Sequence, residues 1–248
     1  MLASAPTALL VRPPARYSSW QAAGNRYLLV ERADLGEPLT PERVCADCTD
    51  ADGVLEVVAA SEDTAEIVIW NPDGSRAEMS GNGTRIAAAW LLARNGGDVA
   101  RVRVGARIVT VRRAGEGLYE SELGAVEVGP RETVAGVELT PVDVGNPHAV
   151  VVDDPERIGE LGPLLETHPR FPERTNVQVV RMDGPGEVTA RVWERGVGET
   201  SASGTSAVAV AAATHGAGEV VVHFPGGDLR VRLHEGRATL IGPASRVG

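Results

Sequence analysis

Two alanine-rich apolar runs constrain the fold of this chain more than any other feature of its sequence. The first is IAAAWLLA, residues 86–93, and the second is AVAVAAA, residues 207–213. A surface helix carries one apolar stripe and one polar face, whereas a helix that is apolar all round has to be buried. The two runs therefore predict central helices, over about residues 83–95 and 204–214, each enclosed by other elements.

Short β-branched segments separated by Gly, Pro, Asp or Asn predict the strands that would enclose these helices. They predict strands at residues 26–32, 54–60, 65–70, 107–113, 136–144, 149–154, 176–182, 187–195, 219–224 and 228–234. Weaker helical patterns occur near residues 41–47 and 156–167. The predicted fold class is α+β, with two similar halves, residues 1–130 and 131–248, and with the boundary within or shortly after residues 126–138.

Both central helices open with the same residue types. Ser80 and Gly81 precede the first helix, and Ser203, Gly204 and Thr205 open the second. A helix start exposes free backbone N–H groups and the positive end of the helix dipole, which makes it suited to a carboxylate or phosphate. The alternative is ordinary N-capping by serine. One such start is more typical of capping, whereas two on buried helices favour anion binding.

Further polar residues occur in short turn-like contexts, and they are the second part of the candidate site. An asparagine in a turn usually caps the backbone, and a neighbouring Glu and Arg often form a surface pair. Arginine nevertheless offers a planar fork to a carboxylate, and carboxylate or amide oxygens can hold an ammonium group. Together the set predicts a cage for an amino acid, made of Asn25, Asn71, Asn82, Asn146, Asn176, Glu194 and Arg195 with the two helix starts.

Charge and hydropathy exclude several classes of function. The net charge of −10 argues against nucleic-acid binding, which requires a basic face. Apolar runs reach only about eight residues, well short of the roughly 18 needed to span a membrane. Residues 1–16 lack a charged start before their brief apolar part, so we expect a mature N-terminus and a cytoplasmic protein. Cys45 and Cys48 form a lone CxxC, which is either a redox pair or, more ordinarily, two reduced thiols, and no metal site is expected.

Several motifs occur together that resemble the diaminopimelate epimerase family. They are NPDGSRAEMSGNGTR, GNPHAV, FPERTNV, ERGVGET with GETSASGT, FPGGDLRV and a C-terminal GPA, and the resemblance extends over about residues 17–244. It implies two pseudo-symmetric halves, each a β-barrel-like sheet around a central helix, with the site between them. It also implies a cytoplasmic homodimer that inverts the α-carbon of an amino acid, without cofactor or metal, in lysine and peptidoglycan precursor synthesis.

The resemblance assigns the two proton-transfer positions to Ser80 and Ser203, where the family carries cysteines. It assigns substrate binding to Asn25, Asn71, Gly81, Asn82, Asn146, Asn176, Glu194, Arg195, Gly204 and Thr205. A serine hydroxyl is a far weaker acid than a thiol at a helix N-terminus, so it needs a neighbouring base, for which His148 is one candidate.

Two more positions depart from the family pattern. Arg26 replaces an aspartate, and the segment 44–53 is shorter than its family counterpart. These differences leave open two alternatives to a diaminopimelate epimerase. One is an isomerase of the same fold with another substrate or proton shuttle, and the other is a non-catalytic relative that binds amino acids.

Overall fold

The structure is a computed structural model that describes residues 17–247 of the chain. The expected mature N-terminus, residues 1–16, therefore lies outside the described residues. Four α-helices are present in the described part: α1 Pro41–Asp47, α2 Gly81–Asn95, α3 Ile158–Glu166 and α4 Gly204–Thr214. Short 3-10 helices occupy Arg32–Asp34 and Pro155–Arg157. None of the helices among residues 17–247 is long and apolar enough to cross a membrane.

Strands make up most of the remaining structure. The first half of the chain contributes β1 Ser18–Ala22, β2 Asn25–Glu31, β3 Gly53–Ala60, β4 Thr64–Trp70, β5 Arg76–Ala77, β6 Val99–Val104, β7 Arg107–Gly115 and β8 Leu118–Ala125. The second half contributes β9 Glu127–Val128, β10 Glu132–Val134, β11 Val137–Asp143, β12 Pro147–Val152, β13 Asn176–Gly184, β14 Glu187–Glu194, β15 Gly198–Thr200, β16 Gly218–Phe224, β17 Gly227–His234, β18 Arg237–Pro243 and β19 Ser245–Val247.

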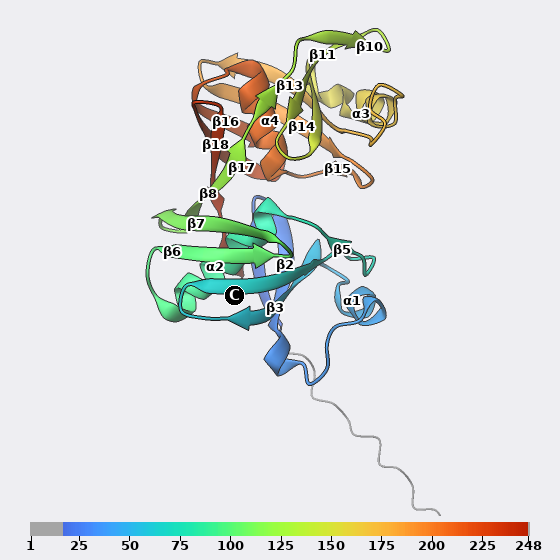
Figure 1. Cartoon of the computed structure of the whole chain (residues 1–248). Coiled ribbons are helices and arrows are strands. Elements are labelled where there is room, and N and C mark those ends of the chain that lie inside the picture. Colours follow the sequence, from blue (N-terminus) through green and yellow to red (C-terminus); the bar gives the residue numbers. More distant parts are fainter. Residues whose placement is uncertain (1–16, 248) are drawn as a thin grey trace, which may run out of the picture.

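The two halves repeat one topology, and they lie one above the other in Figure 1. In the first half β2 pairs with β3 and β4 with β6 in parallel, and the other pairs are antiparallel. The second half has the same pattern, with parallel pairs β12–β13 and β14–β16. Helices α2 and α4 occupy equivalent places in this repeat, between β5 and β6 and between β15 and β16.

Each sheet closes on itself by using a strand that also belongs to the other half. Strand β8 pairs with β18, and its continuation β9 pairs with β11 of the second half. Strand β18 likewise continues into β19, which pairs with β1 of the first half. Closure removes free sheet edges and encloses one helix in each barrel.

Burial follows from this closure. The core of the first half packs around α2, where Ile86, Ala87, Ala88 and Leu91 have no more than 1% of their surface exposed. The core of the second half packs around α4, whose segment from Ala207 to Ala211 is fully buried. A third cluster lies where α3 covers β12 and β13. The predicted α+β class and both central helices are confirmed, and the division of the chain at residues 130 and 131 stays a prediction.

The sequence patterns miss strands β1, β6, β8 and β18, besides the shorter strands of two or three residues. Three of them, β1, β8 and β18, pair with strands distant in the chain, and β6 has only six residues, so each gives a weak signal in isolation. The two cysteines lie at the end of α1 as free thiols, Cys45 exposed and Cys48 buried, a state that a reduced redox pair and two ordinary thiols share.

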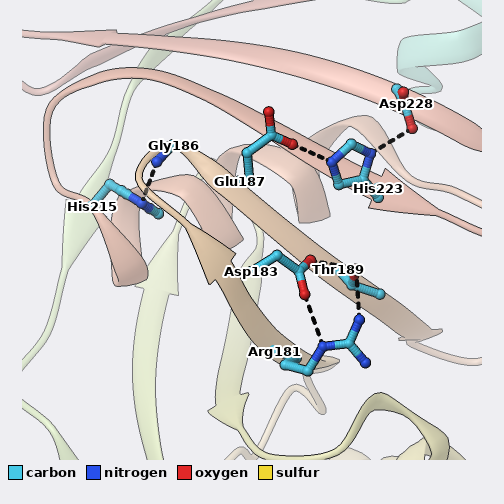
Figure 2. A network of polar contacts seen from close by, with 8 residues as sticks. All are labelled: Arg181, Asp183, Gly186, Glu187, Thr189, His215, His223 and Asp228. Carbon is cyan, nitrogen blue, oxygen red and sulfur yellow. Dashed lines mark hydrogen bonds and ion pairs between the residues drawn. The ribbon is translucent and has the colours of Figure 1, made fainter.

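A polar network covers part of the second half at the ends of β14, β16 and β17 (Figure 2). His223 of β16 lies between the carboxylates of Glu187 and Asp228, with 2.8 Å from its Nδ1 to Asp228. Nearby, Asp183 accepts hydrogen bonds from Arg181 and Thr189, and His215 accepts one from the backbone N–H of Gly186. These contacts join adjacent strands on the protein surface.

Candidate active site

The two Ser-Gly helix starts meet at the junction of the halves. A Cβ placed on Gly81 would lie 3.7 Å from the Cα of Gly204, and one placed on Gly204 would lie 3.8 Å from the Cα of Gly81. Both helices therefore direct their positive ends toward the same region, and a Cβ on Gly204 would clash with the Leu240 side chain, 2.8 Å away. The predicted convergence of two anion-binding helix starts agrees with this geometry.

Ser80 is the N-cap of α2 and has two polar neighbours. Its Oγ accepts a hydrogen bond of 3.0 Å from the backbone N–H of Gly83. The hydroxyl of Tyr27, which belongs to β2, lies 3.1 Å from the same Oγ. Tyr27 is buried, and burial raises its pKa, so the phenol stays protonated at neutral pH.

Ser203 is the N-cap of α4, but its side chain does not cap the helix. It instead forms a hydrogen bond with Glu194, the last residue of β14, and Thr200 donates a second hydrogen bond of 2.6 Å to the same carboxylate. Burial raises the pKa of Glu194, and these two hydrogen bonds partly oppose the shift. One serine is thus paired with a carboxylate and the other with a phenol.

A chain of amides joins the halves beside the serines. The Asn82 side chain on α2 donates a 2.5 Å hydrogen bond to Oδ1 of Asn25, and Asn25 donates a 3.4 Å bond to the hydroxyl of Ser201. Next to Asn25, a Cβ on Gly24 would lie 2.5 Å from the Cα of Gly226. The β1–β2 turn is consequently seated on the β16–β17 turn, and this contact fixes Asn25 near α4.

The polar residues of β12, β13 and the turn after β14 form an adjoining group. The Asn176 side chain accepts a hydrogen bond of 3.0 Å from the backbone N–H of Arg195 and donates one of 2.9 Å to the carbonyl of Pro147. The Arg195 side chain is exposed and donates from Nη1 to the carbonyl of Glu173. Asn176 therefore sets the position of Glu194 and Arg195 through the backbone.

The His148 side chain is hydrogen-bonded to neither Ser80 nor Ser203. Its Nδ1 lies 3.0 Å from the amide nitrogen of Gln178, and its Nε2 lies 3.1 Å from Oδ1 of Asn146. Gln178 also donates to Ser206 in the first turn of α4. Burial lowers the pKa of His148 to about 3. Its candidacy as the base for a serine is wrong because both ring nitrogens are occupied elsewhere, and the residue instead joins Asn146 to α4.

The remaining predicted residues differ in their placement. Thr205 is half-buried on the first turn of α4, beside Gly204. Asn71 lies in the turn after β4, where its side chain donates to Ser75 over 2.9 Å. The backbone N–H of Arg26 donates to Asp52 at the end of the short 44–53 segment, so this segment is tied to the strand that carries Asn25.

Sequence reasoning did not select Tyr27, Thr200 or Ser201 as site residues. Thr200 and Ser201 belong to the motif GETSASGT and Tyr27 stands two residues after Asn25, but nothing in their local sequence reveals a contact with a residue far away in the chain. A large pocket of about 610 Å³ lies elsewhere, between Val57–Glu62 and Arg94, and contains none of the predicted site residues. Among residues 17–247 no group of three His, Cys, Asp or Glu side chains is arranged to hold a metal ion.

Comparison with known proteins identifies relatives over nearly the whole chain. The sequence matches the family described as diaminopimelate epimerase over residues 19–128 and 140–247. It is 35% identical to a diaminopimelate epimerase of Synechococcus elongatus, with 94% of this chain and 96% of that protein covered. It is 38% identical to the diaminopimelate epimerase of Pelotomaculum thermopropionicum, over 79% of this chain and 81% of that protein.

Solved structures of similar fold include a predicted epimerase from Pseudomonas aeruginosa. Its TM-score is 0.71 at 17% identity, with 94% of this chain and 97% of that chain covered. A hydroxyproline epimerase from Agrobacterium vitis gives a TM-score of 0.66 at 15% identity, over 94% of this chain and 89% of that chain. At these identities the likeness concerns the fold.

Proposed function

We infer that this chain, which belongs to the diaminopimelate epimerase family, inverts the α-carbon of diaminopimelate. In this proposal Ser80 and Ser203 are the two proton-transfer groups. The observation that carries this proposal is the contact of two helix starts, each with a serine and each with a different acid–base partner. Inversion requires groups on opposite faces of one carbon, and the repeat supplies one from each half.

The partners give the two serines different roles in the proposed reaction. Glu194, ionised above its raised pKa, accepts the Ser203 hydroxyl proton, and the Ser203 oxygen removes the α-proton of the substrate. The electron pair of the broken C–H bond moves into the substrate carboxylate, which becomes an enediolate. Ser80 then donates its hydroxyl proton to the opposite face of the carbon.

Ser80 is suited to this donation because its oxygen already accepts a hydrogen bond from the Gly83 N–H. With Tyr27 as a second donor, the Ser80 proton is free to point at the substrate and the resulting alkoxide is stabilised. Proton exchange with solvent at Glu194 and Ser80 restores the starting state. In the reverse direction the two serines exchange roles.

The substrate carboxylate fits the N–H groups at Gly81 and Gly204, where both helix dipoles stabilise the charge that develops in the enediolate. Asn25, Asn82, Asn146, Asn176, Arg195 and Thr205 complete the proposed cage, and Asn71 borders it. We further propose a cytoplasmic homodimer that acts in lysine and peptidoglycan precursor synthesis, as the family resemblance implies.

Deuterium exchange tests this function. The protein is incubated with LL-diaminopimelate in heavy water, and deuterium at the α-carbon is followed by NMR beside formation of the meso isomer. We expect exchange and epimerisation by the wild type. We expect a loss on the order of 10²–10³-fold in Glu194→Gln, which keeps the size of the side chain but removes the base.

Thr189→Ser, on the surface of the second half, is the matched control and should leave exchange unchanged. Binding of diaminopimelate without exchange would show the non-catalytic binding relative instead. Exchange with a different amino acid, but not with diaminopimelate, would show the isomerase of other specificity.

A further inference from the structure

Arg85 is an arginine in the interior of the central helix α2, and its side chain has no exposed surface. Among residues 17–247 no carboxylate forms an ion pair with it, and its Nε and Nη1 have no hydrogen-bond partner. Burial lowers its pKa to about 10, so it remains charged at neutral pH. A buried charge without a partner is costly, and its retention calls for an explanation.

The guanidinium group lies against the two helix starts. Its Nη1 is 3.7 Å from the position that a Cβ on Gly81 would occupy and 3.8 Å from the corresponding position at Gly204. On its other side Gly242 makes room for it, because a Cβ there would lie 3.1 Å from Nε and Cζ. The charge is therefore held between the two halves, at the point where both helices begin.

The third guanidinium nitrogen is the one that has a partner. Nη2 of Arg85 donates to Oδ1 of Asn82, and Asn82 donates in turn to Asn25. Because the amide oxygen of Asn82 is occupied by Arg85, its NH₂ group is directed toward Asn25. Arg85 thus orients the amide chain that crosses between the halves.

In the ligand-free protein these features oppose one another. Two helix N-termini already concentrate positive potential at Gly81 and Gly204, and Arg85 adds a full positive charge a few ångströms from them. Such an arrangement is unfavourable until an anion is bound in front of the glycines. The same arrangement strengthens the interaction with any carboxylate, and most strongly with one that gains charge during the reaction.

We propose that Arg85 is a positioning and electrostatic residue of the active site, whose unpaired charge is the counter-ion of the substrate carboxylate and whose hydrogen bond to Asn82 holds Asn25 in place. This proposal rests on the proposed function for the identity of the substrate. The charge itself, however, favours any small anion at the helix starts.

Two matched variants separate charge from structure. Arg85→Gln keeps an amide donor for Asn82 but removes the charge, whereas Arg85→Lys keeps the charge and loses the planar fork. Melting temperatures are measured without ligand, with LL-diaminopimelate and with sulfate, and dissociation constants are measured by calorimetry at 15 °C. Steady-state kcat and KM are measured for all three proteins.

We expect Arg85→Gln to melt at or above the wild-type temperature without ligand, because it relieves an unpaired buried charge. We expect it to bind both anions about 30-fold more weakly and to lose kcat as well as affinity. Arg85→Lys should recover most of the affinity for both anions. A residue with a merely structural role would instead give a lower ligand-free melting temperature with unchanged affinity.

Unchanged affinity of Arg85→Gln for both anions would overturn the proposal, and so would equal loss of affinity in Arg85→Gln and Arg85→Lys. The proposed function can fail separately. If the wild type neither binds nor exchanges diaminopimelate, while its sulfate affinity depends on the charge at position 85, the function is wrong and the role of Arg85 stands.

Discussion

Burial of His148 should make this protein less stable as the pH falls. The ring lies fully inside the second half, with Nδ1 facing the amide nitrogen of Gln178 and Nε2 facing Oδ1 of Asn146. Since Gln178 donates, Nδ1 must accept, and the ring proton sits on Nε2 and is donated to Asn146. A second proton would have to occupy Nδ1, against a donor and on a ring that is almost completely buried.

The magnitude follows from the shift in pKa. Burial, helped by the nearby charge of Arg195, lowers the pKa of His148 to about 3, from about 6.5 in an unfolded chain. Between these values the unfolded state binds a proton that the folded state does not, so the stability falls as the pH falls from about 6.5 toward 3. At about 1.4 kcal/mol per pKa unit, the loss between pH 7 and pH 4 is about 3 kcal/mol.

The assay is urea unfolding at pH 7 and pH 4 for the wild type and for His148→Gln, with free energies obtained by linear extrapolation. Other titrating groups affect both proteins alike, so the quantity compared is the change in unfolding free energy between the two pH values. We expect the wild type to lose about 3 kcal/mol more than the variant. Equal losses would refute the assignment of His148 as a buried neutral link.

Three further outcomes are expected. Ser80→Cys combined with Ser203→Cys should raise α-proton exchange with diaminopimelate on the order of 10³-fold, because a thiol at a helix start is a far stronger acid than a hydroxyl. Either change alone should raise it much less. Unchanged exchange by a double variant that binds substrate would contradict this. Arg195→Ala should weaken diaminopimelate binding about tenfold or more in calorimetry, and an unchanged affinity would mark it as a surface residue. The carboxylates beside His223 raise its pKa, so its ion pairs stabilise the fold fully below about pH 6.5 and lose this effect as the pH rises through the raised pKa. In urea unfolding, His223→Gln should lower the unfolding free energy by less than about 1 kcal/mol at pH 6 and by almost nothing at pH 9.

The predictability of the fold differs between its parts. Helices α2 and α4 could be predicted because an all-apolar run has one stable location, the interior, wherever the strands lie. Strands β6, β8 and β18 were not predicted, because what fixes them is pairing with partners far away in the chain, which no local pattern records. The exchange of β8 and β18 between the halves leaves no local mark at all.

The candidate site divides along the same line. The local motifs determined that two serines stand at two helix starts and that amides and a Glu-Arg pair accompany them. Only the tertiary structure placed Ser80 beside Tyr27 and Ser203 beside Glu194. It also placed His148 against Gln178 and Asn146 and not against either serine. It also decided that Arg85 has no ion-pair partner within residues 17–247, since a missing partner is a property of everything that surrounds a side chain. Residue types and helix starts are set by neighbours in sequence, whereas the pKa and partner of each group depend on burial and on residues brought close by barrel closure.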